Sequence, residues 1–411
     1  MNRQRLLDRF LRYVRIDTTA RPDADTYPSS PGQLELGSLL VDELRSIAIA
    51  DARQDANGIV TATLPPTTGR ETPQIAFCAH LDTSPETTGA GVKPQVFENY
   101  RGGDLELPGG PGLVIRAAEQ PELAGLVGST IITSDGTTLL GADDKAGVTA
   151  IMETAAYLMQ HPEIPRGPVR LCFTCDEEIG RGVDHLRLEQ LASVVCYTLD
   201  GQGADAIDVE TFSADLAVVT IRGVNIHPGI AKGRMVNALR VAADLIGRLP
   251  RAAACPEATD GREGFLHPFE VSGGVAEVKL RTLLRDFSAE GLADWAEMLR
   301  QAASAAASEF PGSKIDVAIT PQYRNMAEGL AREPRAVSYA QRALERLGRC
   351  ARLTIVRGGT DGSRLTEMGL PTPNLATGEH SPHSPLEWAC LEEMVQAAEW
   401  LVALAQVWAE A

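Results

Sequence analysis

Short apolar runs alternate with amphipathic stretches along most of the chain. Four segments with short apolar runs have the length of strands buried on both faces: residues 74–82, 129–136, 169–178 and 194–201. Apolar residues at helical spacing instead predict helices at about 4–15, 33–48, 146–160, 333–348 and 387–408. Because strands alternate with helices, the pattern predicts an α/β fold with a mostly parallel sheet flanked by helices.

The middle of the chain follows a different pattern. Polar and apolar residues alternate there, as in a sheet with one exposed face, in three segments: 215–223, 276–287 and 314–320. Helical patterns near 236–248 and 289–308 lie between them, and strand-like runs resume after residue 350. We therefore expect a small α+β domain at 211–320, inserted into a larger domain formed by 1–210 and 321–411.

The composition adds limits on location and partners. The chain has 411 residues, more than one hydrophobic core usually serves, and a net charge of −17 from 38 basic and 55 acidic side chains. An acidic surface argues against binding to nucleic acids and to anionic membranes. No apolar run approaches the ~20 residues of a membrane span, and the charged first helix lacks the apolar core of a signal peptide. We expect a cytoplasmic protein.

The seven cysteines are an odd number and do not indicate a disulfide framework. Cys172 and Cys175 have C-x-x-C spacing, but they lie in the strand-like run 169–178. Residues three apart on a strand point to opposite faces. We therefore expect two buried structural thiols there.

Acidic residues follow the predicted strands repeatedly. His80 and Asp82 end the first apolar run, and Asp143 and Asp144 follow a short strand-like segment at 138–140. The third and fourth runs end in acids as well: Asp176, Glu177, Glu178 and Asp200. A single acid of this kind is usually a turn or cap residue. In open α/β sheets, however, ligands bind beyond the carboxyl ends of the strands, so we expect these side chains to converge.

Converging carboxylates repel one another and raise each other's pKa unless a cation lies between them. Histidine with carboxylates suits Zn²⁺, with Mn²⁺ or Co²⁺ as alternatives, and a late histidine in "GEHSPHSPLEW" can join the set. Five protein ligands are too many for one tetrahedral catalytic zinc. They suit two ions about 3.5–4 Å apart that share a carboxylate. We therefore expect a site for two divalent metal ions, with zinc as the favoured metal.

The segments that carry these residues resemble the motif series of the M20 family of di-zinc metallopeptidases. They read "AHLDTSP", "GADDKAGV", "CDEEIGRG", "TLDG", "GVNIHPGIAKGRMVNA" and "RGGTDGS", and the similarity runs along nearly the whole chain. Within the family, the pattern is closest to that of the tripeptide aminopeptidases. The resemblance implies a di-zinc aminopeptidase-like catalytic domain with an inserted lid. It also implies release of the N-terminal residue from tripeptides by attack of a metal-bridging hydroxide.

The resemblance assigns a role to each residue of the predicted metal site. His80 is a metal ligand that Asp82 orients, and Asp143 bridges the two ions, with a cis peptide between Asp143 and Asp144. Glu177 is the general base, which takes a proton from metal-bound water and passes it to the leaving amine. The implied metal ligands are His80, Asp143, Glu178, Asp200 and one late histidine.

Two histidines, His380 and His383, compete for that last ligand position. His383 stands in H-S-x-x-E with Glu387, a spacing seen in many members of the family, and a gapless count from "PNLATG" places it at the ligand position. His383 is therefore the predicted ligand, and His380 is expected at the rim of the site. After this histidine, related aminopeptidases have a Gly-Lys-His-Glu run, whereas this chain has Ser-Pro-Leu-Glu at 384–387. The departure leaves the metal chemistry intact but changes the rim that would select tripeptides.

In the inserted domain, the resemblance assigns His227 to the scissile carbonyl and Asn237 and Arg285 to the substrate. Arg357, in the tight loop 357–363, is also expected near the substrate, which would be a small peptide. In many relatives the lid forms a homodimer. The alternatives are another M20 hydrolase (dipeptidase, carboxypeptidase or N-acyl amino acid amidohydrolase), a metal-binding module without catalysis, and an assembly protein that dimerises through its lid. The presence of Glu177 argues against the non-catalytic module, because a scaffold needs ligands but no base.

Overall fold

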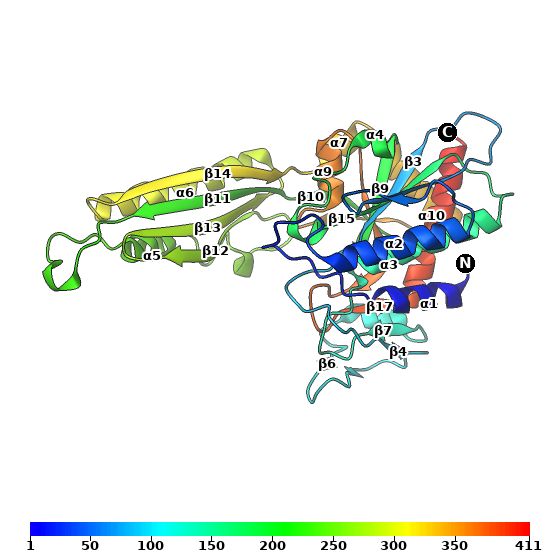
Figure 1. Ribbon diagram of the computed structural model, residues 1–411, viewed down its shortest axis with the longest axis horizontal. Coiled ribbons are helices and arrows are strands. Elements are labelled where there is room, and N and C mark those ends of the chain that lie inside the picture. The colour runs from blue at the N-terminus through cyan, green and yellow to red at the C-terminus, as the bar shows by residue number, and fades with distance from the viewer. The chain divides into compact units, whose positions relative to one another are not determined.

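The computed structural model describes all 411 residues, and the chain forms two compact units (Figure 1). Unit 1 contains Met1–Val209, Met326–Thr354 and Thr360–Ala411, and unit 2 contains Glu210–Asn325 and Ile355–Gly359. Unit 2 thus includes the whole of the expected insertion, 211–320, and adds Glu210, residues 321–325 and Ile355–Gly359. Hydrogen bonding accounts for these additions, since Val356 accepts a backbone bond from Phe212 (3.1 Å) and Asn325 donates to the carbonyl of Phe287 (2.9 Å).

An 11-stranded sheet forms the centre of unit 1. Its central strands are parallel, as the fold prediction required: β8 (Val169–Thr174), β3 (Ile75–His80), β9 (Val195–Gln202) and β16 (Asn374–His380). The edge strands pair antiparallel: β2 (Val60–Leu64) and β1 (Arg53–Gln54) on one side, β17 (Trp388–Cys390), β7 (Ile131–Thr133) and β4 (Gln95–Phe97) on the other. β10 (Ala206–Thr211) joins β16, and β15 (Arg352–Val356) joins β10.

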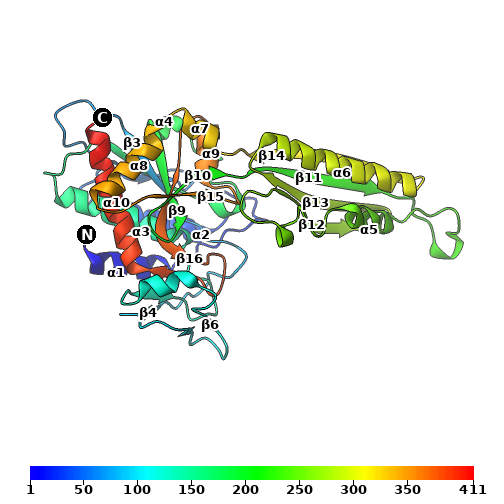
Figure 2. The ribbon, with the colours of Figure 1, turned by 180° about the vertical axis from the view of Figure 1, so that it is seen from behind.

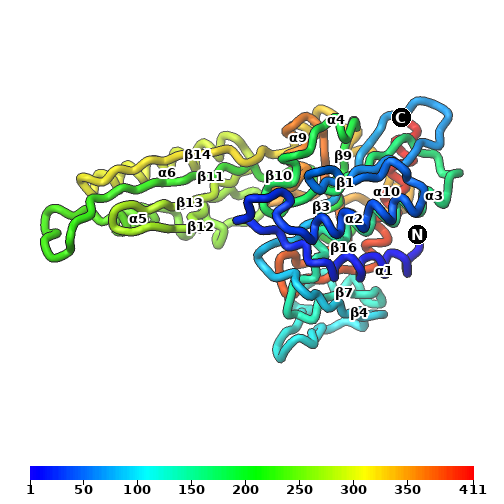
Figure 3. Tube along the Cα trace, viewed as in Figure 1, coloured from blue at the N-terminus to red at the C-terminus, as the bar shows by residue number.

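Helices cover both faces of this sheet. One face packs against α2 (Pro31–Ser46), α3 (Ala142–Gln160), α8 (Arg335–Arg346) and α10 (Leu391–Ala409), and Figure 2 shows α8 and α10 running side by side. α4 (Leu188–Leu191) and α9 (Asp361–Glu367) contribute to the core on the other face. α1 (Arg3–Tyr13) packs on α3, and both chain ends lie in unit 1 (Figure 3).

Successive residues of the central strands point to opposite faces, as their period of two requires. Phe77 lies in the core under α3, whereas Cys78 lies in the core on the opposite side. Cys172 and Cys175 are likewise free, buried and divided between the two cores. The prediction of two structural thiols on opposite faces is confirmed.

Unit 2 has an antiparallel four-stranded sheet in the order β12 (Phe265–Gly273), β13 (Glu277–Asp286), β11 (Ser213–Arg222) and β14 (Lys314–Tyr323). α5 (Ala238–Arg248) and α6 (Ala289–Glu309) share one hydrophobic core with this sheet. Alternation predicted three of the strands but missed β12. That strand contains Pro268 and a register shift between Pro268 and Glu270, so its polar and apolar residues do not alternate regularly.

The segment between β3 and α3 is more ordered than a plain loop. It contains β5 (Leu105–Glu106), β6 (Val114–Ile115) and η1 (Pro121–Leu126), which pack with Trp388 in a small core. The strand expected at 138–140 is absent, and that prediction was wrong. The backbone N–H groups of Leu140 and Gly141 donate to the Glu387 carboxylate (2.7 Å each) rather than to a neighbouring strand.

The remaining elements are short: η2 (Glu177–Ile179), η3 (Pro228–Ile230), η4 (Pro256–Ala258) and α7 (Ala327–Ala331). No helix of the chain is both long enough and apolar enough to cross a membrane.

Candidate metal centre

The ends of the parallel strands in unit 1 bring the predicted ligands together. His80 is the last residue of β3, Glu178 lies in η2 just after β8, and Asp200 lies inside β9. Asp143 comes from the start of α3, and His383 from the turn between β16 and β17. The crevice that ligands use in open α/β sheets therefore collects all five side chains.

These five residues form two groups of three that share Asp143. The ligand atoms of His80, Asp143 and Asp200 lie within 4.8 Å of one another, and so do those of Asp143, Glu178 and His383. His80 Nε2 is 3.0 Å from Asp143 Oδ1, whereas His383 Nε2 is 3.2 Å from Asp143 Oδ2. The two oxygens of Asp143 thus face different groups, which is the arrangement that a bridging ligand needs.

The outer members of each group are also close. His80 Nε2 lies 3.6 Å from Asp200 Oδ1, and His383 Nε2 lies 2.9 Å from Glu178 Oε2. Burial and the charge of Asp143 raise the pKa of Glu178 to about 8 and that of Asp200 to about 7. Burial would lower the pKa of His383, but its contacts with Asp143 and Glu178 raise it to about 11. The crowded acids therefore compete for protons that bound cations would displace.

The donor atoms fit a pair of divalent ions. Each group combines one imidazole nitrogen with carboxylate oxygens, a set that suits zinc and neighbouring transition metals. Glu178 Oε1 is buried and has no hydrogen-bond partner. Buried carboxylate oxygens are rarely left without a partner, so this atom is a further sign of a ligand that the protein chain does not supply.

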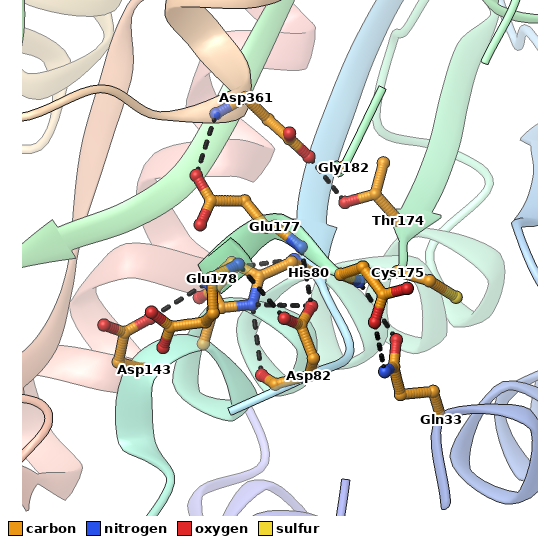
Figure 4. A network of polar contacts seen from close by, with 12 residues as sticks. Gln33, His80, Asp82, Asp143, Thr174, Cys175, Glu177, Glu178, Gly182 and Asp361 are labelled. Carbon is orange, nitrogen blue, oxygen red and sulfur yellow. Dashed lines mark hydrogen bonds and ion pairs between the residues drawn. The ribbon is translucent and has the colours of Figure 1, made fainter. Parts of the chain in front are cut away.

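Asp82 supports both the metal ligands and the predicted base (Figure 4). Its Oδ1 accepts the N–H of Glu177 (3.0 Å) and its Oδ2 accepts the N–H of Glu178 (3.1 Å). His80 Nδ1 lies 3.1 Å from the Asp82 carbonyl oxygen and 3.5 Å from Asp82 Oδ1. Asp82 thus contacts the histidine that the resemblance implied it orients, and its carboxylate fixes the turn that carries the two glutamates.

The paired aspartates have separate tasks. The peptide between Asp143 and Asp144 is cis, as the resemblance implied, and regular helical geometry begins only after Asp144. Asp144 Oδ2 accepts the N–H of His80 (3.0 Å), so this acid holds the end of β3. Lys145 is buried and donates to the carbonyl of Ile16 (2.8 Å). Asp144 and Lys145 therefore stabilise the backbone around the site.

Two buried acids near the ligands lay outside the predicted set. Glu387 accepts the N–H groups of Gly141 (2.7 Å) and Asp143 (3.1 Å), and its position after His383 was the one sequence signal for it. Glu379 is 2% exposed and groups with Asp144 and Asp200 within 4.8 Å. Nothing in the sequence indicated Glu379, because it lies within β16 rather than beyond its end.

The structure separates the two late histidines. His380 is 4% exposed, stacks on Trp388 with ring centroids 3.7 Å apart, and lies 2.7 Å from Glu393 Oε2 through its Nε2. The expected rim position for His380 was wrong, because β16 carries its side chain into the core. His383 instead points at Asp143 and Glu178, so it is the histidine that can complete a metal site.

The residues predicted to contact substrate lie in unit 2, where each has a local partner. His227 is exposed and its Nδ1 accepts the N–H of Gly229 (3.1 Å). Asn237 caps α5 by accepting the N–H of Leu239 (3.0 Å). Arg285 donates to the carbonyl of Arg357 (3.2 Å). The substrate contacts expected of these residues stay predictions.

Arg357 has a pronounced structural role inside unit 2. Its guanidinium donates to the carbonyls of Gly261 (2.8 Å) and Glu263 (3.0 Å) and to Thr259 Oγ1 (2.9 Å). It also lies over the ring of Phe212 at 5.1 Å. These contacts tie the 259–263 loop to the segment that returns to unit 1.

Comparison with known proteins gives consistent matches. The model of peptidase family M20/M25/M40 matches residues 135–407. Peptidase T of Geobacillus thermodenitrificans is 44% identical over 400 residues, which cover 97% of each chain. Among solved structures, aminopeptidase PepT from Bacillus cereus superposes with a TM-score of 0.76 at 26% identity, over 100% of this chain and 99% of that one. A dinuclear metal-binding M20 peptidase of Bacillus subtilis, YXEP, has a TM-score of 0.65 at 16% identity, over 99% and 98% of the two chains.

Proposed function

Because the chain belongs to peptidase family M20/M25/M40, we propose that it is a metal-dependent aminopeptidase that releases the N-terminal residue of tripeptides. The observation that carries this proposal is the pair of ligand groups sharing Asp143, with a further glutamate, Glu177, that belongs to neither group. A metal store or a structural site would need the ligands alone. The similarity to proteins named Peptidase T supports the choice of tripeptides.

The metals we propose are two zinc ions. One would be held by His80, Asp143 and Asp200, and the other by Asp143, Glu178 and His383. When bound, such ions lower the pKa of water and polarise a peptide carbonyl. The nitrogen and oxygen donors would also accept Mn²⁺ or Co²⁺, so metal analysis of the purified protein has to decide between them.

Glu177 would be the proton carrier. Its Oε1 is held by the N–H of Asp361 (3.1 Å), and its backbone N–H is held by Asp82, so the carboxylate has a fixed direction. Burial raises the pKa of Glu177 well above its ordinary value. A carboxylate with a raised pKa can accept a proton from the attacking water and return it to the leaving amine. That transfer is the step that distinguishes Glu177 from the ligand beside it.

The test is a peptide panel assayed with metal-free protein and after addition of Zn²⁺, Mn²⁺ or Co²⁺. We expect hydrolysis of tripeptides only with metal, and only when the N-terminal amine is free. An N-acetylated tripeptide, a dipeptide and an N-acyl amino acid are the matched comparisons, read by mass spectrometry. Equal cleavage of the acetylated peptide would favour the amidohydrolase alternative. The cytoplasmic location and the homodimer through the inserted domain stay predictions, which cell fractionation and light scattering would test.

A further inference from the structure

Asp361 is a buried carboxyl group that belongs to neither ligand group. It is 6% exposed and is the first residue of α9, immediately after the cap residue Thr360. The sequence predicted a tight loop at 357–363 and gave Asp361 no role in it, whereas the structure begins α9 at Asp361. Figure 4 shows Asp361 beside Glu177, with its side chain directed toward Thr174.

Asp361 makes contacts in two directions. Its backbone N–H donates to Glu177 Oε1 (3.1 Å), so its main chain holds the proposed base. Its own Oδ2 accepts the hydroxyl of Thr174 (2.6 Å), so its side chain is fixed to the last residue of β8. Thr174 is the register partner of His80 on the neighbouring strand β3. Glu177, through Asp361, and His80 are therefore both positioned by the paired strands β8 and β3.

Gly182 closes the other side of the Asp361 carboxylate. A Cβ atom added to Gly182 would lie 1.9 Å from Asp361 Oδ1 and 2.6 Å from its Cγ. The backbone of Gly182 is outside the left-handed region, so this approach, rather than a special conformation, requires a glycine. The carboxylate is thus confined between the Thr174 hydroxyl and the Gly182 backbone.

The chain on the N-terminal side of Asp361 is the junction between the two units. The polypeptide passes from unit 2 to unit 1 between Gly359 and Thr360, and Gly358 precedes that junction. Gly358 and Gly359 have no side chains to hold this junction, and Gly359 packs on the Tyr323 ring so closely that an added Cβ would lie 2.6 Å from it. The Asp361 side chain adds a fixed point directly after the junction, at the residue whose N–H holds Glu177. Burying a carboxyl group for a single threonine bond is unfavourable, as the rise of the Asp361 pKa to about 8 through burial reflects.

We propose that Asp361 is a positioning residue for the general base: its carboxyl group anchors the start of α9, so that its own N–H holds Glu177 in the direction needed for proton transfer. This inference rests on the proposed role of Glu177. Misdirection of a reacting group by a fraction of an ångström reduces the rate without weakening substrate binding. Loss of the anchor should therefore lower kcat and leave KM and the metals in place.

The variants that test it are Asp361→Ala, Asp361→Asn and Thr174→Val, with Thr154→Val as the control. Thr154 is a buried threonine of α3 whose hydroxyl also donates a hydrogen bond, to the carbonyl of Ala150 (2.8 Å), but it lies outside the site. We expect kcat to fall ~10–100-fold in Asp361→Ala and ~3–10-fold in Thr174→Val, with KM changed less than ~3-fold. Asp361→Asn keeps an acceptor for Thr174 and should recover most of kcat, and Thr154→Val should match the parent protein.

Each variant is assayed on whichever panel peptide the unmodified protein cleaves best, and its metal content is measured. If the unmodified protein cleaves no tripeptide but cleaves another peptide, the proposed substrate is wrong while Asp361 is still tested. A kcat within twofold of the parent in both Asp361→Ala and Thr174→Val would overturn the inference, and so would a loss that only follows loss of metal. If Asp361→Ala does not fold, the contrast between Thr174→Val and Thr154→Val gives the same decision.

Discussion

The two units differ in what their functional candidates are bonded to. In unit 1, Asp82 holds the turn with Glu177 and Glu178, while Asp143 lies between His80 and His383. In unit 1, the proposed base, the proposed metal ligands and Asp82 thus hold one another in position. In unit 2, the predicted substrate residues are bonded to their own scaffold, as when Asn237 caps α5.

This difference reflects what each set of residues needs in order to act. The ligands of one metal site must all come from the protein. Their side chains therefore lie close together in the fold even when no metal is bound. Residues that bind substrate are completed by a molecule from outside, and until then they use local partners. The residues of the proposed reaction can therefore be identified from unit 1 alone. The substrate contacts predicted for unit 2 need a bound peptide to be tested.

The largest effect should separate the base from the ligand beside it. Glu177→Gln should lower kcat by ~10²–10⁴-fold and keep both metals, because the amide cannot accept the proton. Glu178→Gln should instead lower metal occupancy, since an amide is a poorer ligand than a carboxylate. Both are measured by steady-state kinetics and metal analysis of the purified variants. Loss of metal in Glu177→Gln with full metal in Glu178→Gln would reverse the two roles.

Variants of His380 and His383 test which of the two histidines is the metal ligand in unit 1. His383→Ala should remove one metal and most of the activity, because it takes away the only imidazole of its ligand group. His380→Ala should keep both metals and lower the free energy of unfolding by about 1–3 kcal/mol, since it removes a buried ring that stacks on Trp388. Metal content and denaturant unfolding check both. One metal missing from His380→Ala and two present in His383→Ala would contradict the assignment.

A smaller effect is expected from unit 2, and it tests whether that unit takes part in the chemistry. If His227 polarises the scissile carbonyl, His227→Ala should lower kcat by ~10²-fold, typical of one lost donor to a developing oxyanion. Both metals should stay bound. His267→Ala is a suitable control, because His267 is another histidine of unit 2 to which no role is assigned. Equal rates in the two variants would confine the chemistry to unit 1.

The smallest effect concerns Asn237, which caps α5 and is also predicted to contact the substrate. Because Asn237 caps α5, Asn237→Ala should lower the free energy of unfolding by about 1 kcal/mol. Asn237→Ser restores a capping oxygen, so it should restore stability. If Asn237 also binds substrate, KM should be raised in both variants. Unchanged KM in Asn237→Ser would leave this residue with a structural role alone.

Much of unit 1 could be predicted because its signals are local. Mostly apolar runs mark β3, β8 and β9, and acids at or just beyond their ends mark the metal site. Asp200 precedes the end of β9 by two residues, so it lies inside its strand rather than beyond it. The short apolar run at 138–140 was wrongly predicted as a strand, since the N–H of Leu140 is bonded to Glu387 and that of Leu139 to the carbonyl of Thr88, both far away in sequence.

What could not be predicted depends on contacts between distant segments. Glu379 reaches the ligands only because β16 lies beside β9 in the sheet. The burial of His380 depends on Trp388 of β17 lying opposite it. Asp361 lies in the motif "RGGTDGS", but that motif gave it no role, and the role proposed for it follows only from its distances to Glu177 and Thr174.

If two cations bind as proposed, the sharing of Asp143 by both ligand groups would make their affinities inseparable. A cation held at Asp143 would fix the carboxylate for the second cation, which favours binding, but it would also withdraw negative charge, which opposes binding. The balance is a coupling free energy, and by reciprocity each ion must change the affinity of the other by the same factor. An affinity measured for either ion therefore belongs to the pair, and it changes with the occupancy of the neighbouring site. Replacing this one residue would remove a ligand from both proposed sites at once, so both metal affinities should fall together.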